Sequence, residues 1–441
     1  MRNVLLIAFY FNQTNEVASK RLRGLAKYLP EFGWNPIIIV PKLNNTPHNI
    51  DNSNFKVIET EYEDMLDKWL KKLNISLNVN EEKNSNISNP PISKNNQFLS
   101  SLISTAGEVF AYPDGMKYWH DPAIEIAKET IEINNIEAII SSSWPITSHV
   151  IAKDLKKLYD IPWVADLRDL WNLNPYINHT FIRNYFEKKL EIETFKYADV
   201  LTTTTDLAAM TLKKLHPNKK IYSILSGFDP EELKSNHTKN NLKNKSNSSD
   251  KLNFVYTGLL YGGKRDPTFL FESIKQLIIE RKINPNLISL DFYGDNDGLE
   301  KIAKNYHVNT ILNLHGSIPN EEVLKKQRES QVLLLLSWNN KKENMFLPGK
   351  IYEYLAAQRP ILSIGYKEGS LKNLIEDTGV GFHVSTLNQT KETILKIYNN
   401  FIENGYVKYK ANNNLNDYTL LSTAGKFGKL LNLLTKKRIY E

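Results

Sequence analysis

The sequence predicts two doubly wound α/β domains, and three observations lead to that fold class. Short apolar runs rich in β-branched residues alternate with longer stretches of helical periodicity through most of the 441 residues. Several runs are apolar at consecutive positions, which is typical of central parallel strands covered on both faces. The alternation occurs twice, on either side of a polar tract. Strand–helix alternation of this kind predicts parallel sheets with helices on both faces.

In the first half, the apolar runs predict six strands, and helical periodicity predicts four helices between them. The strands are residues 4–11, 37–40, 138–142, 163–166, 200–204 and 221–225, and the helices are residues 18–28, 122–134, 149–159 and 185–197. In the second half the same criteria predict strands at residues 254–257, 289–293, 311–314, 332–336 and 360–364, with helices at residues 267–280 and 299–306 and another beginning near Gly349.

Polar tracts suggest the domain limits. Residues 229–252 are poor in apolar residues and predict a linker between a domain at residues 1–228 and a domain at residues 253–415. Residues 74–97 form a second Asn-rich tract, which predicts a flexible insertion inside the first domain. The amphipathic end at residues 416–441 predicts a helix that packs back across the domain junction.

Composition excludes several classes of protein. There is no cysteine, so disulfides, thiolate metal sites and a cysteine nucleophile are excluded, and a cytoplasmic location is expected. The apolar run at residues 4–11 is too short to span a membrane and is interpreted as a first strand. The net charge of +7 suits nucleic acid, an anionic membrane surface or phosphorylated substrates. We expect no nucleic-acid partner, because the sequence contains none of the usual recognition modules.

The segment at residues 347–362 carries the most informative pattern. Gly349 allows a ligand to approach the backbone, and the free N–H groups of the helix that follows form an anion site. Lys350 adds a mobile positive charge, and Glu353, one turn later, offers a carboxylate to sugar hydroxyls. These groups suit a diphosphate with a sugar on each side. The alternative is an ordinary loop–helix unit with a surface glutamate.

A second loop in the same half carries two cations. Gly258 follows a predicted strand, and Gly263 directly precedes Lys264 and Arg265. Arginine grips phosphate oxygens with two parallel bonds, whereas lysine acts as a point charge. Because both loops follow strands, we expect them to open on one edge of the sheet, where α/β proteins bind ligands. The alternative is a solvated basic turn.

Polar residues also follow strands of the first half. Asn15 lies in a polar loop, residues 9–16, after the first strand. Asp166, Arg168 and Asp169 follow another strand and could bind acceptor hydroxyls, orient a substrate or act as a base. A structural ion-pair cluster explains these three equally well.

Two further motifs lie after strands of the second half. His315 and Gly316 could frame a nucleobase with backbone groups, although a lone histidine there is more often a turn residue. Asp295 and Asp297 resemble a metal-binding Asp-x-Asp, but a turn with Asp297 as helix N-cap explains them more simply. No histidine pair has metal-ligand spacing, so we expect no metal and no cofactor.

Taken together, these motifs resemble the GT-B glycosyltransferases, most closely glycosyltransferase family four, over nearly the whole chain. The resemblance rests on residues 9–15 with 21–29, 163–171, 257–267, 315–319 and 349–357 with Arg359 and Pro360. It implies two Rossmann-like domains facing a cleft, with the donor on the C-terminal domain. Lys264 and Arg265 would hold the diphosphate and Glu353 the donor ribose, so these three and Asp166 are the predicted catalytic residues.

The chain departs from the family pattern at three positions. Family members commonly carry an arginine where this chain has Leu259 and a histidine at the strand end where it has Asp166. Many also carry two glutamates with seven residues between them, but here Met345 replaces the first and Glu343 lies two residues early. These departures concern the donor-sugar contacts more than the fold.

The resemblance implies a retaining, metal-independent transferase. Its donor would be a nucleotide-diphosphate sugar and its acceptor a glycan or lipid-linked glycan destined for the cell surface. The alternatives are a nucleotide-sugar epimerase of the same fold and a non-catalytic sugar-nucleotide-binding protein. The basic charge and the apolar-aromatic residues 98–119 further predict a peripheral position on an anionic membrane face.

Overall fold

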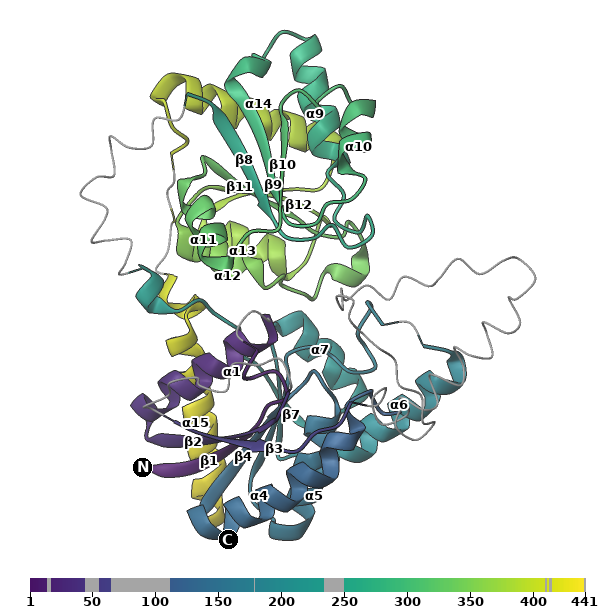
Figure 1. Cartoon of the computed structure of the whole chain (residues 1–441), viewed down its shortest axis with the longest axis vertical. Helices are drawn as coiled ribbons and strands as arrows, with labels where there is room; N and C mark the ends of the chain where they lie inside the picture. The colour runs from purple at the N-terminus through teal and green to yellow at the C-terminus, as the bar shows by residue number, and fades with distance from the viewer. Residues whose placement is uncertain are drawn as a thin grey trace, which may run out of the picture. The chain divides into compact units, whose positions relative to one another are not determined.

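The computed structural model describes residues 1–13, 17–43, 55–64, 112–177, 179–233, 250–408, 411 and 415–439. They divide into two compact units, each built on one parallel sheet (Figure 1). Unit one comprises Met1–Thr203, Ala209–Ser223 and Ala424–Glu441, and unit two comprises Thr204–Ala208 and Ile224–Thr423. The predicted insertion at residues 74–97 and most of the predicted linker lie outside the described residues.

Unit one contains a seven-stranded parallel sheet in the order β3-β2-β1-β4-β5-β6-β7. Its strands are β1 (Arg2–Ile7), β2 (Trp34–Pro41), β3 (Lys56–Thr60), β4 (Ile136–Ser142), β5 (Trp163–Leu167), β6 (Val200–Thr203) and β7 (Lys220–Ser223). The helices of this part of the chain are α1 (Val17–Tyr28), α4 (His120–Asn134), α5 (Thr147–Tyr159), α6 (Phe181–Phe195) and α7 (Asp206–Leu215). The central strands are buried because apolar residues occupy consecutive positions, as in Val4–Ile7 of β1.

Unit two contains a six-stranded parallel sheet in the order β10-β9-β8-β11-β12-β13. Its strands are β8 (Leu252–Thr257), β9 (Ile288–Tyr293), β10 (Leu312–Gly316), β11 (Val332–Leu336), β12 (Ile361–Ile364) and β13 (Gly381–Val384). Its helices are α9 (Thr268–Ile279), α10 (Leu299–Asn305), α11 (Asn320–Glu329), α12 (Lys350–Ala357), α13 (Ser370–Thr378) and α14 (Leu387–Asn404). Apolar clusters lie on both faces of this sheet, so the predicted doubly wound α/β class is confirmed.

The structure differs from the sequence prediction at several elements, and helices α7, α11, α13 and α14 were not predicted. The first strand ends at Ile7, because Phe9 and Phe11 turn into aromatic contacts and Phe9 packs edge-on against Trp119 at 5.3 Å. The edge strands β3 and β13 were not predicted, since neither carries a continuous apolar run. Helix α6 begins at Phe181, four residues before its predicted start, where the Thr180 hydroxyl accepts a bond from the Arg183 amide.

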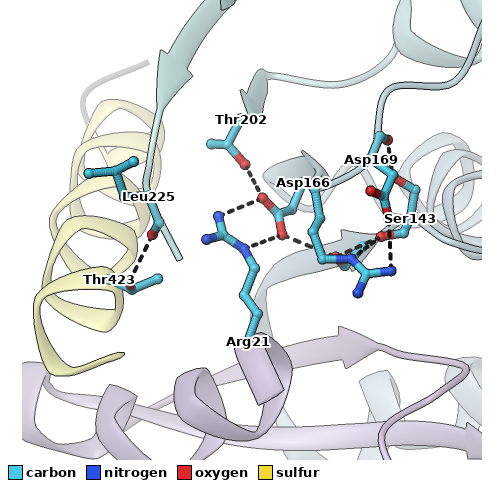
Figure 2. Close-up of polar contacts among 9 residues, drawn as sticks. Arg21, Ser143, Asp166, Asp169, Thr202, Leu225 and Thr423 are labelled. Carbon is cyan, nitrogen blue, oxygen red and sulfur yellow. Dashed lines mark hydrogen bonds and ion pairs between the residues drawn. The ribbon is translucent and has the colours of Figure 1, made fainter. Parts of the chain in front are cut away.

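The last helix, α15 (Leu420–Ile439), belongs to both units. Its first residues lie in unit two, where the Thr423 hydroxyl donates to the Leu225 carbonyl at 2.9 Å. Its remainder lies in unit one, where the Asn432 side-chain oxygen accepts a bond of 3.1 Å from the Trp34 indole. Polar side chains therefore hold this helix to Leu225 (Figure 2) and to Trp34.

Candidate functional site

The candidate site of unit two lies where the strand order reverses. Strands β8 and β11 are neighbours, and the chain winds outward from them in opposite directions. Loops that follow two such strands border the position where open α/β sheets bind ligands. The loop after β8 contacts the loop after β11, as shown by the Lys264 ammonium, which lies 4.8 Å above the centre of the Trp338 ring.

Gly258 fills a position that only glycine can occupy. It follows β8 with φ of 118°, and its amide donates a 2.8 Å bond to the Tyr293 carbonyl. A Cβ here would lie 2.6 Å from the Lys350 Nζ, so a side chain would displace that ammonium. The absence of a side chain at Gly258 therefore lets the Lys350 side chain approach this backbone closely.

The Lys350 ammonium lies beneath the Gly258 turn. Its Nζ donates to the Thr257 carbonyl and lies 4.2 Å above the centre of the Tyr256 ring. Burial lowers the pKa of Lys350 well below its usual range, the charge of Arg265 lowers this pKa further, and Glu353 opposes the change. The sequence predicted a mobile charge at this position. In the structure the ammonium instead ties the start of α12 to the end of β8.

Glu353 is held by a residue that the sequence did not suggest. The side-chain amide of Gln327, on α11, donates to the Glu353 carboxylate and to the Thr257 hydroxyl, each at 3.1 Å. Gln327 is wholly buried. Its position within a charged stretch of a polar helix gave no local signal, because the contacts span 26 and 70 residues of sequence.

The two predicted phosphate-binding cations are partly exposed and lie over aromatic rings. Lys264 lies over Trp338, and the Arg265 guanidinium carbon lies 4.1 Å from the centre of the Tyr261 ring. Gly263 has φ of 84° just before them, which allows the tight turn. Aromatic faces hold cations weakly, so both side chains can turn toward a bound anion.

His315 and Gly316 have separate surroundings. The His315 ring stacks on Tyr293 at 4.3 Å, and its Nε2 lies 3.0 Å from an Asp291 carboxylate oxygen. Gly316, with its carbonyl bonded to the Gly294 amide at 2.7 Å, borders an open pocket of about 380 Å³. The pocket is lined by Gly294, Asp295, Asn296, Asp297, Leu314, Gly316 and Ser317. Gly316 therefore borders this pocket, whereas His315 is not among the residues that line it.

The Asp295–Asp297 motif does not cap helix α10, contrary to the capping prediction. The N-cap is Gly298 in a left-handed conformation, which has no side chain to cap with. Asp295 and Asp297 are instead exposed at the edge of the pocket. Within the described part of the chain, no group of three or more His, Asp or Glu side chains is placed to hold a metal ion.

In unit one, Asp166 is wholly buried at the end of β5. Its oxygens accept two bonds of 2.9 Å from Arg21, one of 2.8 Å from Thr202 and one of 3.0 Å from Ser142 (Figure 2). Burial opposes ionisation, but the Arg21 guanidinium and these hydroxyls together hold the pKa of Asp166 below its usual value. The carboxylate thus joins α1, β4, β5 and β6, which favours the structural ion pair, with Arg21 as the partner.

Arg168 and Asp169 form a separate pair just beyond β5. The Arg168 guanidinium lies 3.0 Å from an Asp169 oxygen and also donates to the Ser143 carbonyl at 3.1 Å (Figure 2). Asp169 is partly exposed, so of the predicted acceptor-side residues it is the one with a described, accessible carboxylate. Asn15 lies outside the described residues.

No protein-family model and no curated protein sequence matches this chain. Solved structures do match it along nearly its whole length. Sucrose-phosphate synthase from Thermosynechococcus elongatus superposes with a TM-score of 0.63 at 14% identity, covering 99% of this chain and 100% of that one. Anabaena HepE in complex with UDP gives a TM-score of 0.55 at 10% identity, covering 100% and 99%. The galactosyltransferase WaaB of the lipopolysaccharide outer core gives 0.52 at 10% identity, covering 99% and 98%.

These similarities show that the chain has the GT-B fold that the sequence resemblance implied. At sequence identities of 10–14%, these structural similarities are evidence for the fold only. Function therefore has to be argued from the residues of this chain.

Proposed function

We propose that the protein is a glycosyltransferase that moves a sugar from a nucleotide-diphosphate sugar to a glycan or lipid-linked acceptor. The observation that carries the proposal is the grouping of Lys264, Arg265 and Glu353 on the loops and helix that follow β8 and β11 of unit two. The structures of HepE with UDP and with UDP-glucose support a nucleotide-sugar donor on this fold.

The chemistry follows from the charges. The diphosphate leaving group gains negative charge as the bond to the sugar breaks, and groups fixed around it stabilise that charge. Lys264 and Arg265 would contact the phosphate oxygens, together with the backbone amides of Gly349 and Lys350. The next amides of α12, those of Ile351 and Tyr352, already donate to the Pro348 and Gly349 carbonyls. Glu353, with one oxygen held by Gln327, would accept hydrogen bonds from the ribose hydroxyls.

We also propose the finer features that the sequence resemblance implied. Transfer would retain the anomeric configuration and need no metal, and the product would be a cell-surface polysaccharide or a precursor of one. The similarity to WaaB, a galactosyltransferase of the lipopolysaccharide outer core, supports such an acceptor class by analogy. None of the helices in the described residues combines the length and apolar character that crossing a membrane requires.

Ligand-dependent thermal stability tests the donor proposal. The full chain is heated with a panel of UDP-, GDP- and ADP-sugars, since a ligand that binds the native state raises its melting temperature by mass action. We expect one nucleotide class to stabilise the wild type and to lose that effect in Glu353→Ala. A chain that no nucleotide sugar stabilises would contradict the proposal. If analysis of the reaction products finds an isomerised nucleotide sugar and no net release of nucleotide, the protein is an epimerase instead.

A further inference from the structure

In the first turns of helix α6 of unit one, large apolar side chains are exposed and charged side chains are buried. Its buried positions include Arg183, Glu187 and Glu191. Its exposed positions include Phe181 at 87%, Ile182 at 69%, Tyr185 at 61% and Phe186 at 50% exposure. A surface helix normally has the opposite pattern, with its apolar stripe facing the core. An exposed aromatic cluster of this kind marks an interaction surface.

The buried polar residues fix the orientation of the helix. The Arg183 guanidinium pairs with the Glu187 carboxylate at 2.6 Å and also donates to the Pro113 carbonyl at 2.8 Å. Further along the helix, Glu191 accepts from the Asn172 amide at 3.0 Å and lies 3.2 Å from the His216 ring. Breaking a buried charged contact of this kind is strongly destabilising. The helix therefore cannot rotate to bury its aromatic residues.

Exposed lysines adjoin the aromatic cluster. Lys188 and Lys189 follow one to two turns after Phe181 and Ile182, at spacings that place them on the same side of the helix. Within the described residues, neither lysine forms an ion pair with a carboxylate. We call this surface the α6 face; it consists of Phe181, Ile182, Tyr185, Phe186, Lys188 and Lys189.

We propose that the α6 face docks on an anionic lipid surface. Phenylalanine and tyrosine enter the interfacial layer of a bilayer, while neighbouring lysines select acidic headgroups. A second copy of the chain suits this face less well, because the face as defined offers two cations and no carboxylate to pair with them. The proposal deepens the proposed function, on which it rests only for the view that the acceptor is lipid-linked.

This surface differs from the one that the sequence suggested. Residues 98–111 of the predicted segment 98–119 lie outside the described residues. Trp119 is wholly buried, and its indole donates to the Thr60 hydroxyl at 2.8 Å, so Trp119 cannot enter a bilayer. Tyr112 lies beside α6 instead, because its hydroxyl donates to the Phe186 carbonyl at 3.2 Å.

Co-sedimentation of the full chain with vesicles tests the proposal. Vesicles of phosphatidylcholine alone are compared with vesicles that also contain phosphatidylglycerol, at low and high salt. We expect pelleting with the anionic vesicles only, weakened by salt. Lys188→Glu with Lys189→Glu should lower the partition coefficient about 25-fold, at roughly five-fold for each lysine removed. Tyr185→Ser with Phe186→Ser should lower it about ten-fold or more.

Matched controls replace exposed residues of the same kinds elsewhere. Ile279→Ser, on α9, and Lys304→Glu, on α10, should leave vesicle binding unchanged. Unchanged melting temperatures would show that the α6 variants fold. Equal pelleting with neutral and anionic vesicles, no pelleting, or α6 variants that bind like wild type would overturn the proposal. Self-association in sedimentation velocity that the α6 variants abolish would assign the face to a second copy.

The two proposals fail separately. If the α6 variants lose vesicle binding and no nucleotide sugar stabilises the chain, the docking proposal stands and the nucleotide-sugar proposal is rejected. Nucleotide-sugar binding with no selective vesicle binding would leave the transferase and remove the docking surface.

Discussion

Replacing Gln327 by glutamate tests the proposed donor site at the hydrogen bond that holds Glu353. In the wild type the Gln327 amide donates to Glu353 at 3.1 Å and to the Thr257 hydroxyl at 3.1 Å. Gln327→Glu keeps the size of the side chain but places a second carboxylate against the first. A hydrogen bond between residue 327 and Glu353 can then form only when one of the two carboxylates carries a proton.

The expected size of the effect follows from the distance between the two carboxylates. Two unit charges about 3 Å apart repel by about 5 kcal/mol at an effective dielectric constant of about 20. Glu353 is partly exposed, so solvent screening reduces this repulsion. What remains favours a proton shared by the two carboxylates in mildly acidic solution, and that proton is lost as the pH rises.

Calorimetric titration provides the assay, with the nucleoside diphosphate whose sugar gives the largest thermal shift as the probe. In Gln327→Glu, we expect binding at about pH 8 to be roughly ten-fold weaker than at about pH 5.5, because like charges then disrupt the ribose contact. Wild type should not lose affinity in this way, because the terminal phosphate gains negative charge as the pH rises through about 6 and its contacts with Lys264 and Arg265 then strengthen. The matched control is Gln276→Glu on α9, where the amide donates to Glu272 at 2.8 Å on a helix outside the site.

Two results would refute this reasoning. If Gln327→Glu binds nucleotide with wild-type affinity across this pH range, Glu353 does not contact the ligand. If Gln276→Glu reproduces the pH dependence, the effect comes from unit two as a whole and not from the site.

Three further predictions concern phosphate binding, metals and acid stability. Lys264→Ala should lower the transfer rate at least about ten-fold, because a charge-assisted phosphate bond contributes roughly 1.5–3 kcal/mol. The control Lys304→Ala, which removes an exposed ion pair, should leave the rate unchanged. Wild-type steady-state kinetics in a folded Lys264→Ala variant would exclude a phosphate contact. Transfer should survive EDTA, and activity that chelation abolishes and manganese restores would show a metal requirement. Burial lowers the pKa of His149 to about 3, so native His149 stays neutral while the unfolded chain gains its proton below pH 6.5. Its contribution to stability is therefore complete above pH 6.5 and declines as pH falls, by about 2 kcal/mol at about pH 5, and denaturation curves of His149→Gln should lack this part of the decline.

Local pattern predicted the sheets well. Strand β11 was predicted with its observed limits, and the strands at β8 and β9 within one or two residues, because buried parallel strands carry continuous apolar runs. The edge strand β3 was missed because only alternate positions of an edge strand need be apolar. The phosphate loop was predicted from the glycines before Lys264 and Arg265, whose conformational freedom belongs to those residues themselves.

The sequence by itself determined the fold class and the alternation of strands and helices, and it suggested the two cations and one carboxylate of the proposed donor site. Each of these follows from the properties of neighbouring residues. The tertiary structure alone decided which groups meet: Gln327 with Glu353, and Arg21 with Asp166 across 145 residues of sequence. It also turned the aromatic face of α6 outward, since buried pairs such as Arg183 with Glu187 hold the opposite face inward. Such contacts depend on how the sheets and helices pack, and no short stretch of sequence carries that information.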